Sequence, residues 1–185
     1  MACISSWFPS QGERVYVLSD GSVDLVTRAA GVGFVLLIPE PLTVIASGCA
    51  YWPWASPLRM EAEAIRYGVQ YARKLKFRNI FVCSDAEVLI KLLNDPGPGP
   101  PQLMDVISAI RCPGSQGEYI SYVKVPRQCV TGPEALAKYA RQAKMSLAGV
   151  FAENQKLRSL LGPHFSSFHL CIDVVKHVIF NSALP

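Results

Sequence analysis

Three apolar runs near the start of the chain, separated only by turns, constrain its fold more than any other feature. They cover residues 15–18, 33–38 and 43–50, and Pro39-Glu40-Pro41 breaks the chain between the second and the third. Short apolar runs between turn signals are typical of strands. Because strands joined by short turns pair with their neighbours, we expect an antiparallel meander.

After this meander the chain alternates between helical and strand patterns. Ser56-Pro57 is suited to cap and open a helix, and Ile65, Val69 and Ala72 follow at helical spacing. In order, we expect a helix at 58–75, a strand at 80–84, a helix at 86–93, a break rich in Pro and Gly at 94–101, a helix at 102–110, a strand at 119–125 and a helix at 132–145. This order predicts an α/β fold in which helices pack on a five-stranded mixed sheet.

Four acidic residues lie near the ends of these predicted elements. Asp20 follows the first apolar run, and Asp85 comes directly after the strand pattern that ends at Ser84. Glu61 lies early in the first predicted helix, and Glu134 lies in the first turn of the last one. Rigid element ends can hold such carboxylates in fixed positions.

Carboxylates grouped in this way suit the hydrolysis of phosphodiesters. Two divalent ions roughly 3.5–4 Å apart can activate water and stabilise both the attacked phosphoryl and the leaving oxygen. Mg²⁺ prefers oxygen ligands and keeps several waters, so a few carboxylates are enough to bind it. The alternative is that these acids are solvated surface groups, since the chain has 14 Asp plus Glu.

The residues around the first two acids resemble motifs of the ribonuclease H family, in particular of the plant-type, retrotransposon-related domain. In that family a strand ends in Asp-Gly-Ser, as in Asp20-Gly21-Ser22, and an Ala-Gly-x-Gly strand follows, as in Ala30-Gly31-Val32-Gly33. The next motif is an Ala-Glu-x-x-Ala helix with Gly seven residues after the Glu. Because Gly68 has that spacing, the resemblance selects Glu61 over Glu63.

The other two family motifs lie in the second half of the chain. A strand followed by Ser-Asp is similar to Ser84-Asp85. A Val-Pro-Arg segment that leads to Ala-Asp-Ala-Leu-Ala-Lys is similar to Val125-Pro126-Arg127 and to the run from Pro133 to Lys138. The combination of five spaced motifs is more specific than any one of them.

The resemblance implies a ribonuclease H-like fold, with an antiparallel meander followed by parallel strands. It also implies hydrolysis of the RNA strand of an RNA–DNA hybrid with Mg²⁺ or Mn²⁺. Asp20 and Asp85 would be the core metal ligands, and Glu61 would complete one metal site and help to hold the substrate 2′-hydroxyl. Glu134 would bind the second ion or its water.

Three departures from the family pattern favour a second interpretation. Glu134 stands where the family has Asp, and Lys124 and Val130 stand where it tends to have His and Asn. Glu carries one more methylene than Asp and places its oxygens differently. The second interpretation is a catalytically weak or inactive nucleic-acid-binding or interaction module with the same fold.

Four further residues are candidates for contacts with the nucleic acid. Lys124 and Arg127 flank the end of the fifth predicted strand and are suited to phosphates, or they are simply exposed cations. Gly21 and Ser22 would let the substrate backbone and a 2′-hydroxyl come close, or they form only a turn between strands.

Composition narrows the class of protein. A chain of 185 residues that is 50% hydrophobic suits one domain with a core, and its net charge of +4 permits nucleic-acid binding without demonstrating it. The longest apolar stretch is about half the roughly 20 residues of a membrane span, and residues 1–13 lack the features of a secretory signal. The six cysteines form no Cys-x-x-Cys motif, which favours a reduced, intracellular protein, cytoplasmic or nuclear. We expect a monomer without a membrane partner.

We divide the chain into an N-terminal extension (1–12), a ribonuclease H-like domain (13–145) and a C-terminal extension (146–185). The extension lies beyond the family pattern, yet it has apolar residues at spacings of three and four, which predicts a helix. These residues are Phe165, Phe168, Ile172, Val175 and Ile179. Such a helix would pack on the domain or contact a protein partner, unless the extension is irregular.

Overall fold

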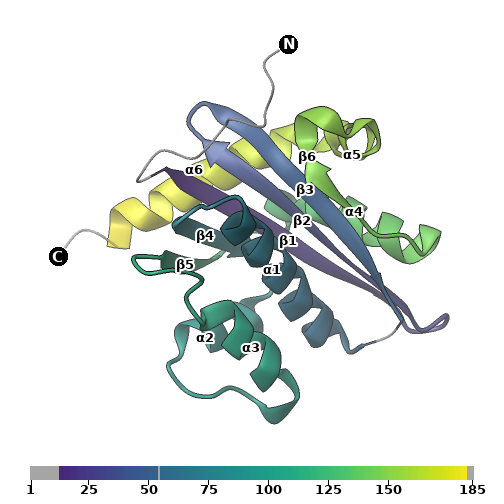
Figure 1. Ribbon diagram of the computed structural model, residues 1–185, viewed down its shortest axis with the longest axis horizontal. Helices are drawn as coiled ribbons and strands as arrows, with labels where there is room; N and C mark the ends of the chain where they lie inside the picture. Colours follow the sequence, from purple (N-terminus) through teal and green to yellow (C-terminus); the bar gives the residue numbers. More distant parts are fainter. Residues whose placement is uncertain (1–12, 54, 183–185) are drawn as a thin grey trace.

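The structure is a computed structural model that describes residues 13–53 and 55–182. A six-stranded sheet in the order β5-β4-β1-β2-β3-β6 runs through the middle of these residues, with helices on both of its faces (Figure 1). The predicted α/β fold with a mixed sheet is therefore confirmed. The prediction that the N-terminus lacks a secretory signal falls on residues that, up to position 12, lie outside the described ones.

The first three strands form the predicted antiparallel meander. They are β1 (Arg14–Asp24), β2 (Ala29–Pro39) and β3 (Leu42–Trp52). β2 is buried along almost its whole length, because helices cover both faces of the sheet at this position. Each strand extends beyond the apolar run that predicted it, since backbone pairing continues past both ends of that run.

Two parallel strands lie on the other side of β1. β4 (Asn79–Ser84) pairs with β1, and β5 (Tyr119–Lys124) pairs with β4. The helix α1 (Pro57–Lys74) connects β3 to β4, and the side chain of Ser56 caps it by accepting a hydrogen bond from the backbone N–H of Arg59. Because β1 and β4 run in the same direction, residues that follow their paired segments meet at one edge of the sheet.

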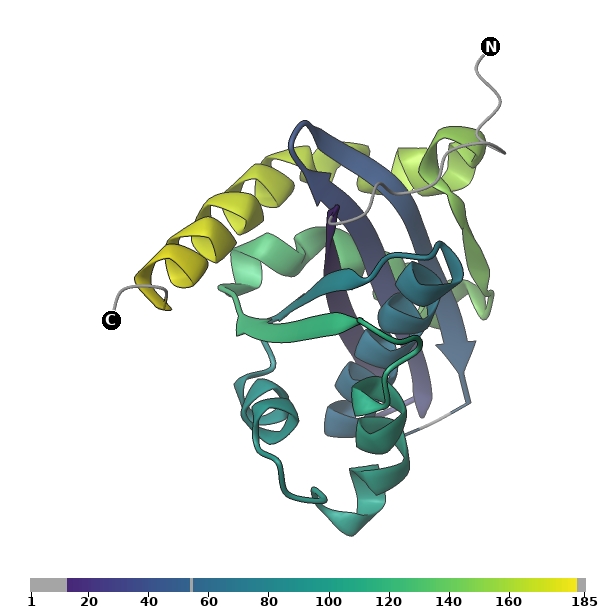
Figure 2. The same cartoon turned by 60° about the vertical axis from the view of Figure 1, so that its left-hand side comes forward.

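The remaining helices complete two layers around the sheet. On one face α1 packs with α2 (Glu87–Asn94) and α3 (Met104–Arg111), and on the other lie α4 (Thr131–Ala143), α5 (Gln155–Leu161) and α6 (Phe165–Ser182). Figure 2 shows α6, in yellow, and α1 on opposite sides of the sheet. Short 3-10 helices connect these elements: η2 (Pro101–Leu103), η3 (Arg127–Val130), η4 (Phe151–Glu153) and η5 (Gly162–His164).

Two glycines of β2 determine where α4 lies. A β-carbon added to Gly33 would be 2.2 Å from the backbone oxygen of Pro133, and one added to Gly31 would be 2.3 Å from the backbone oxygen of Ala137. Both distances are far below contact, so only glycine lets the helix backbone approach the strand this closely. The first turn of α4 is thereby held directly above the middle of the sheet.

The prediction of five strands was wrong by one strand. β6 (Leu147–Val150) pairs with the middle of β3, opposite Ala46 to Cys49, and is the edge strand on that side of the sheet. It lies within the predicted C-terminal extension, which also contains α5 and α6. In the structure α6 spans Phe165–Ser182, and Phe168, Ile172 and Val175 are buried against the sheet. The extension therefore packs on the rest of the fold.

Two predictions from composition concern these described residues. None of their helices combines the length and the apolar character needed to cross a membrane. The five cysteines among them, Cys49, Cys83, Cys112, Cys129 and Cys171, are free thiols.

Candidate metal centre

Three of the four predicted acids converge at one edge of the sheet. Asp20 comes from β1, Glu61 from the second turn of α1 and Asp85 from the residue after β4. Each offers a carboxylate oxygen, and these oxygens all lie within 4.8 Å of one another. The parallel pairing of β1 with β4 brings the two aspartates together over 65 positions of sequence (85 minus 20).

Gly21 brings α1 close enough to add the third carboxylate. A β-carbon at this position would be 2.7 Å from the backbone carbon of Met60 and 2.8 Å from the backbone nitrogen of Glu61. The N–H of Gly21 also donates a hydrogen bond to Oε2 of Glu61 at 3.2 Å. The Asp-Gly motif thus supplies one ligand and orients another.

The surroundings of the cluster oppose the ionisation of two of its members. Burial is the largest cause that raises the pKa of Asp20, and the negative charges of Asp85 and Glu134 raise it further. Burial also raises the pKa of Glu61, and the charges of Asp20 and Asp85 add to this effect. The positive charge of Arg127 lowers both pKa values, but by less. Carboxylates held together in this way are stabilised by an added cation.

The set of donor atoms suits a hard divalent cation. Three carboxylate oxygens without any thiolate or imidazole are the ligands that Mg²⁺ and Mn²⁺ prefer, whereas Zn²⁺ sites usually include Cys or His. Rigid elements position all three carboxylates; Asp20 is buried, and Glu61 and Asp85 are half-buried. Asp20, Glu61 and Asp85 therefore fit Mg²⁺ or Mn²⁺.

The fourth predicted acid, Glu134, is also among the described residues, but it is not a member of this cluster. It does occupy the first turn of α4, as predicted, and its charge reaches Asp20. Its Oε1, however, accepts a hydrogen bond from Nη2 of Arg127 at 2.9 Å. This ion pair was not predicted, because it depends on the turn through η3 that brings residues 127 and 134 together.

The other predicted contact residues have partners within the chain. Lys124 forms an ion pair with Glu87 at 3.1 Å. The hydroxyl of Ser22 accepts a hydrogen bond from Nε of Arg141, and Nη1 of Arg141 also binds Asp24 at 2.8 Å. Asp20, Ser22 and Asp24 alternate along β1, so a period of two residues places them on one face. We did not predict that Arg141 binds Ser22 and Asp24. The period of two in β1 was the signal that these two residues share a face with Asp20.

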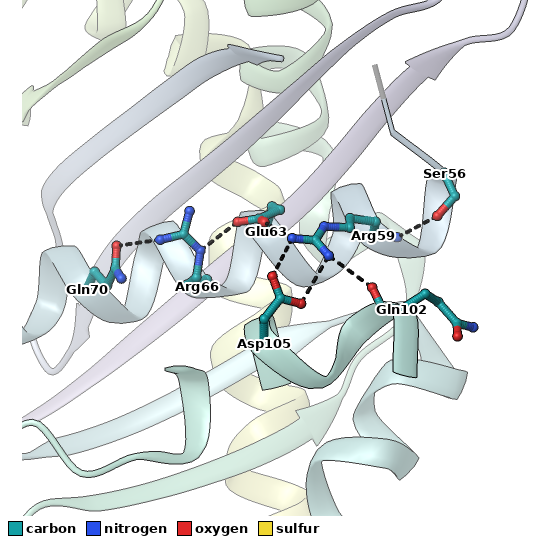
Figure 3. A network of polar contacts seen from close by, with 7 residues as sticks. All are labelled: Ser56, Arg59, Glu63, Arg66, Gln70, Gln102 and Asp105. Carbon is teal, nitrogen blue, oxygen red and sulfur yellow. Dashed lines mark hydrogen bonds and ion pairs between the residues drawn. The ribbon is translucent and has the colours of Figure 1, made fainter. Parts of the chain in front are cut away.

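A network of polar contacts connects residues of α1 with Gln102 of η2 and Asp105 of α3 (Figure 3). Glu63 accepts hydrogen bonds from Arg66 at 2.6 Å and from Arg59 at 3.3 Å. Arg59 also binds both carboxylate oxygens of Asp105, at 3.0 and 2.7 Å, and the backbone oxygen of Gln102 at 2.9 Å. The network joins α1 to the start of α3 and so holds the helix that carries Glu61.

The fold and this cluster define an α/β domain of the ribonuclease H type with an acidic site at the ends of its central strands. Residues 18–140 match the model of the reverse transcriptase-like family, and the chain belongs to this family. The matched segment contains all four predicted acids. No curated protein matches the chain in sequence.

Solved structures share this fold. The N-terminal RNase H domain of Rv2228c from Mycobacterium tuberculosis is 24% identical, with a TM-score of 0.65 over 71% of this chain and 96% of that one. RNase H1 from Halobacterium salinarum is 24% identical, with a TM-score of 0.64 over 70% of this chain and 98% of that one. LC11-RNase H1, solved in complex with an RNA/DNA hybrid, is 16% identical, with a TM-score of 0.59 over 70% of this chain and 98% of that one. The predicted ribonuclease H-like fold is thus confirmed.

Proposed function

We propose that the chain is a metal-dependent endonuclease that hydrolyses the RNA strand of RNA–DNA hybrids. The observation that carries this proposal is the convergence of Asp20, Glu61 and Asp85 within 4.8 Å in a ribonuclease H-like fold. Bound Mg²⁺ or Mn²⁺ would activate the attacking water and neutralise the charge that develops on the phosphoryl group. The complex of LC11-RNase H1 with an RNA/DNA hybrid supports the choice of substrate.

The residues of the cluster have different tasks in this proposal. Asp20 and Asp85 hold the cation from the central strands, and Glu61 completes the site in an orientation fixed by the N–H of Gly21. Glu61 also contacts the 2′-hydroxyl of the RNA strand, which distinguishes RNA from DNA. Glu134 contributes to a second ion or to its water.

The substrate approaches over the end of β1 and the end of β5. The small residues Gly21 and Ser22 leave room for the substrate backbone, and Lys124 and Arg127 contact its phosphates. The Val125-Pro126-Arg127 segment and the run from Ala135 to Lys138 support a plant-type, retrotransposon-related origin for the domain.

One observation favours a second candidate function, a catalytically weak or inactive nucleic-acid-binding module. Glu134 replaces the Asp expected at this position, and its Oε1 is bound to Arg127 instead of facing the cluster. Replacing Glu134 by Asp separates the two functions. A large gain in cleavage marks a weakened enzyme, and no gain favours the binding module.

The proposal is tested by cleavage of a labelled RNA–DNA hybrid with Mg²⁺ or Mn²⁺, beside single-stranded RNA and duplex DNA. We expect hybrid-specific cleavage that EDTA abolishes and that Asp85→Asn reduces by about a thousand-fold or more, because the metal provides several kcal/mol of transition-state stabilisation. Circular dichroism checks that the variant is folded. Equal cleavage by the Asp85→Asn and native proteins would overturn the proposal.

A further inference from the structure

Among the described residues, Arg127 is a cation that interacts both with the carboxylate cluster and with Glu134. It begins η3, the turn between β5 and α4, and Nη2 of its guanidinium lies 2.9 Å from Oε1 of Glu134. Its positive charge lowers the pKa of both Asp20 and Glu61. In return, Glu134, Asp85 and Asp20 raise the pKa of Arg127.

Lys124, three residues earlier, provides an internal comparison. It is also exposed and lies at the end of β5, but it pairs with Glu87, which has Lys91 as a second partner. Neither Asp20 nor Glu61 has Lys124 among the charges that shift its pKa. The two cations at this corner therefore differ in the acids that they neutralise.

The ion pair between Arg127 and Glu134 is exposed to solvent, so Glu134 can exchange Arg127 for another cation. The side chain of Arg127 is 71% exposed and that of Glu134 is 39% exposed, so water competes with the contact and the pair is weak. A divalent cation attracts a carboxylate more strongly than a solvated guanidinium does, because its charge is higher and more concentrated. Oε1 of Glu134 has to leave Arg127 before this oxygen can bind such a cation.

We propose that Arg127 is a resident counter-cation of the acidic site, which holds Glu134 apart from the carboxylate cluster and competes with divalent cations for the site. This inference rests on the proposed function only in taking the cluster as a divalent-cation site. It does not require hydrolysis. Arg127 is thus a positioning residue for Glu134 and sets the cation concentration at which the site fills.

The test is a Mn²⁺ titration of the full chain without nucleic acid, with free Mn²⁺ followed by electron paramagnetic resonance. Arg127→Gln should bind Mn²⁺ about three-fold more tightly or better, because the competing charge is gone and Glu134 is released. Arg127→Lys keeps the charge and should stay close to the native protein. Lys124→Gln is the matched control and should change the affinity by less than about 1.5-fold, since Lys124 pairs with Glu87.

A double variant separates the route through Glu134 from a general charge effect. In the Glu134→Gln background, Arg127→Gln should give a clearly smaller gain in affinity than in the native background. Unchanged or weaker Mn²⁺ binding by Arg127→Gln would overturn the inference, as would an equal gain from Lys124→Gln.

The two proposals fail in different experiments. A native protein that binds Mn²⁺ without cleaving the hybrid refutes the proposed hydrolysis and leaves the role of Arg127 intact. A native protein that cleaves the hybrid, with Arg127→Gln unaltered in Mn²⁺ affinity, refutes only the role of Arg127. A native protein that binds no Mn²⁺ overturns both. Asp85→Asn serves as the control that the titration reports on the cluster.

Discussion

Glu61 and Glu63 lie two residues apart on α1, where Glu61 is half-buried and Glu63 is buried, and their surroundings are opposite. Glu63 is 3% exposed at its side chain and has two arginines as partners, at 2.6 and 3.3 Å. Glu61 has one backbone N–H as a hydrogen-bond donor and two aspartates as neighbours. The chain balances the charge of Glu63 itself, whereas burial and the charges of Asp20 and Asp85 raise the pKa of Glu61.

The same contrast separates a structural site from a functional one. Arg59, one of the two arginines around Glu63, also binds Asp105 of α3, so this network holds two helices together (Figure 3). The cluster around Glu61 joins three elements as well, but its like charges repel one another. The ion pairs of the network stabilise the native state. The repulsion within the cluster destabilises it, and a bound cation would relieve this repulsion.

The largest expected effect is that two matched substitutions change the free energy of unfolding in opposite directions. Glu63→Gln should lower the free energy of unfolding by roughly 2–3 kcal/mol, at the low end for a broken buried pair because Arg59 and Arg66 are partly exposed. Glu61→Gln should raise it by about 1 kcal/mol at pH 8 in EDTA, because burial and acidic neighbours raise the native pKa of Glu61 to about 9 and glutamine removes the cost of protonating this carboxyl on folding. Urea denaturation measures both. If both substitutions destabilise the protein equally, the comparison fails.

A smaller effect is expected from pH in the absence of metal. The pKa values of Asp20 and Glu61 are raised in the native state, so that state binds more protons than the unfolded chain above about pH 4. Their stabilising contribution is complete below that pH and is lost as the pH rises through the native pKa values. The melting temperature in EDTA should therefore fall less steeply with pH in a variant that carries Asp20→Asn and Glu61→Gln.

Added metal should reverse this trend. Binding requires ionised carboxylates, so the stabilisation by Mn²⁺ should increase with pH. A native protein whose melting temperature rises with Mn²⁺ equally at pH 5 and pH 8 would contradict this account of the cluster.

The smallest expected effect concerns the outer end of the network. Asp105 is 64% exposed, so Asp105→Asn should destabilise the protein much less than Glu63→Gln, despite two hydrogen bonds to Arg59. Salt screens exposed pairs, so the difference should shrink further in 0.5 M NaCl, whereas the loss in Glu63→Gln should persist. If Asp105→Asn and Glu63→Gln lower the free energy of unfolding equally, burial does not determine how much each acid of the network contributes to stability.

The sequence predicted the three acids of the cluster, from β1, from α1 and from the residue after β4, because local patterns encode them. Asp20 and Asp85 each follow a short apolar strand, and the spacing to Gly68 distinguished Glu61 from Glu63. That spacing has a physical cause, since a β-carbon on Gly68 would be 2.4 Å from a side-chain carbon of Val17. The glycine sets how closely α1 lies on β1, and this distance brings Glu61 to the cluster.

The features that the sequence did not predict depend on contacts between distant segments. β6 is four residues long and only partly buried, and it is a strand because β3 offers it a free edge. The pairing of Glu134 with Arg127 likewise depends on the geometry of η3 and on the seat of α4 over the glycines of β2. Local propensity carries no signal for either.

The short strand β6 also affects how the protein behaves among its own copies. Without it, the backbone groups of β3 from Ala46 to Cys49 would face solvent and could pair with a strand of another chain. Apolar residues flank that stretch, and Phe168, Ile172 and Val175 of α6 cover the sheet nearby. A chain cut after residue 145 would expose both surfaces at once, so we expect it to aggregate more readily than the full chain.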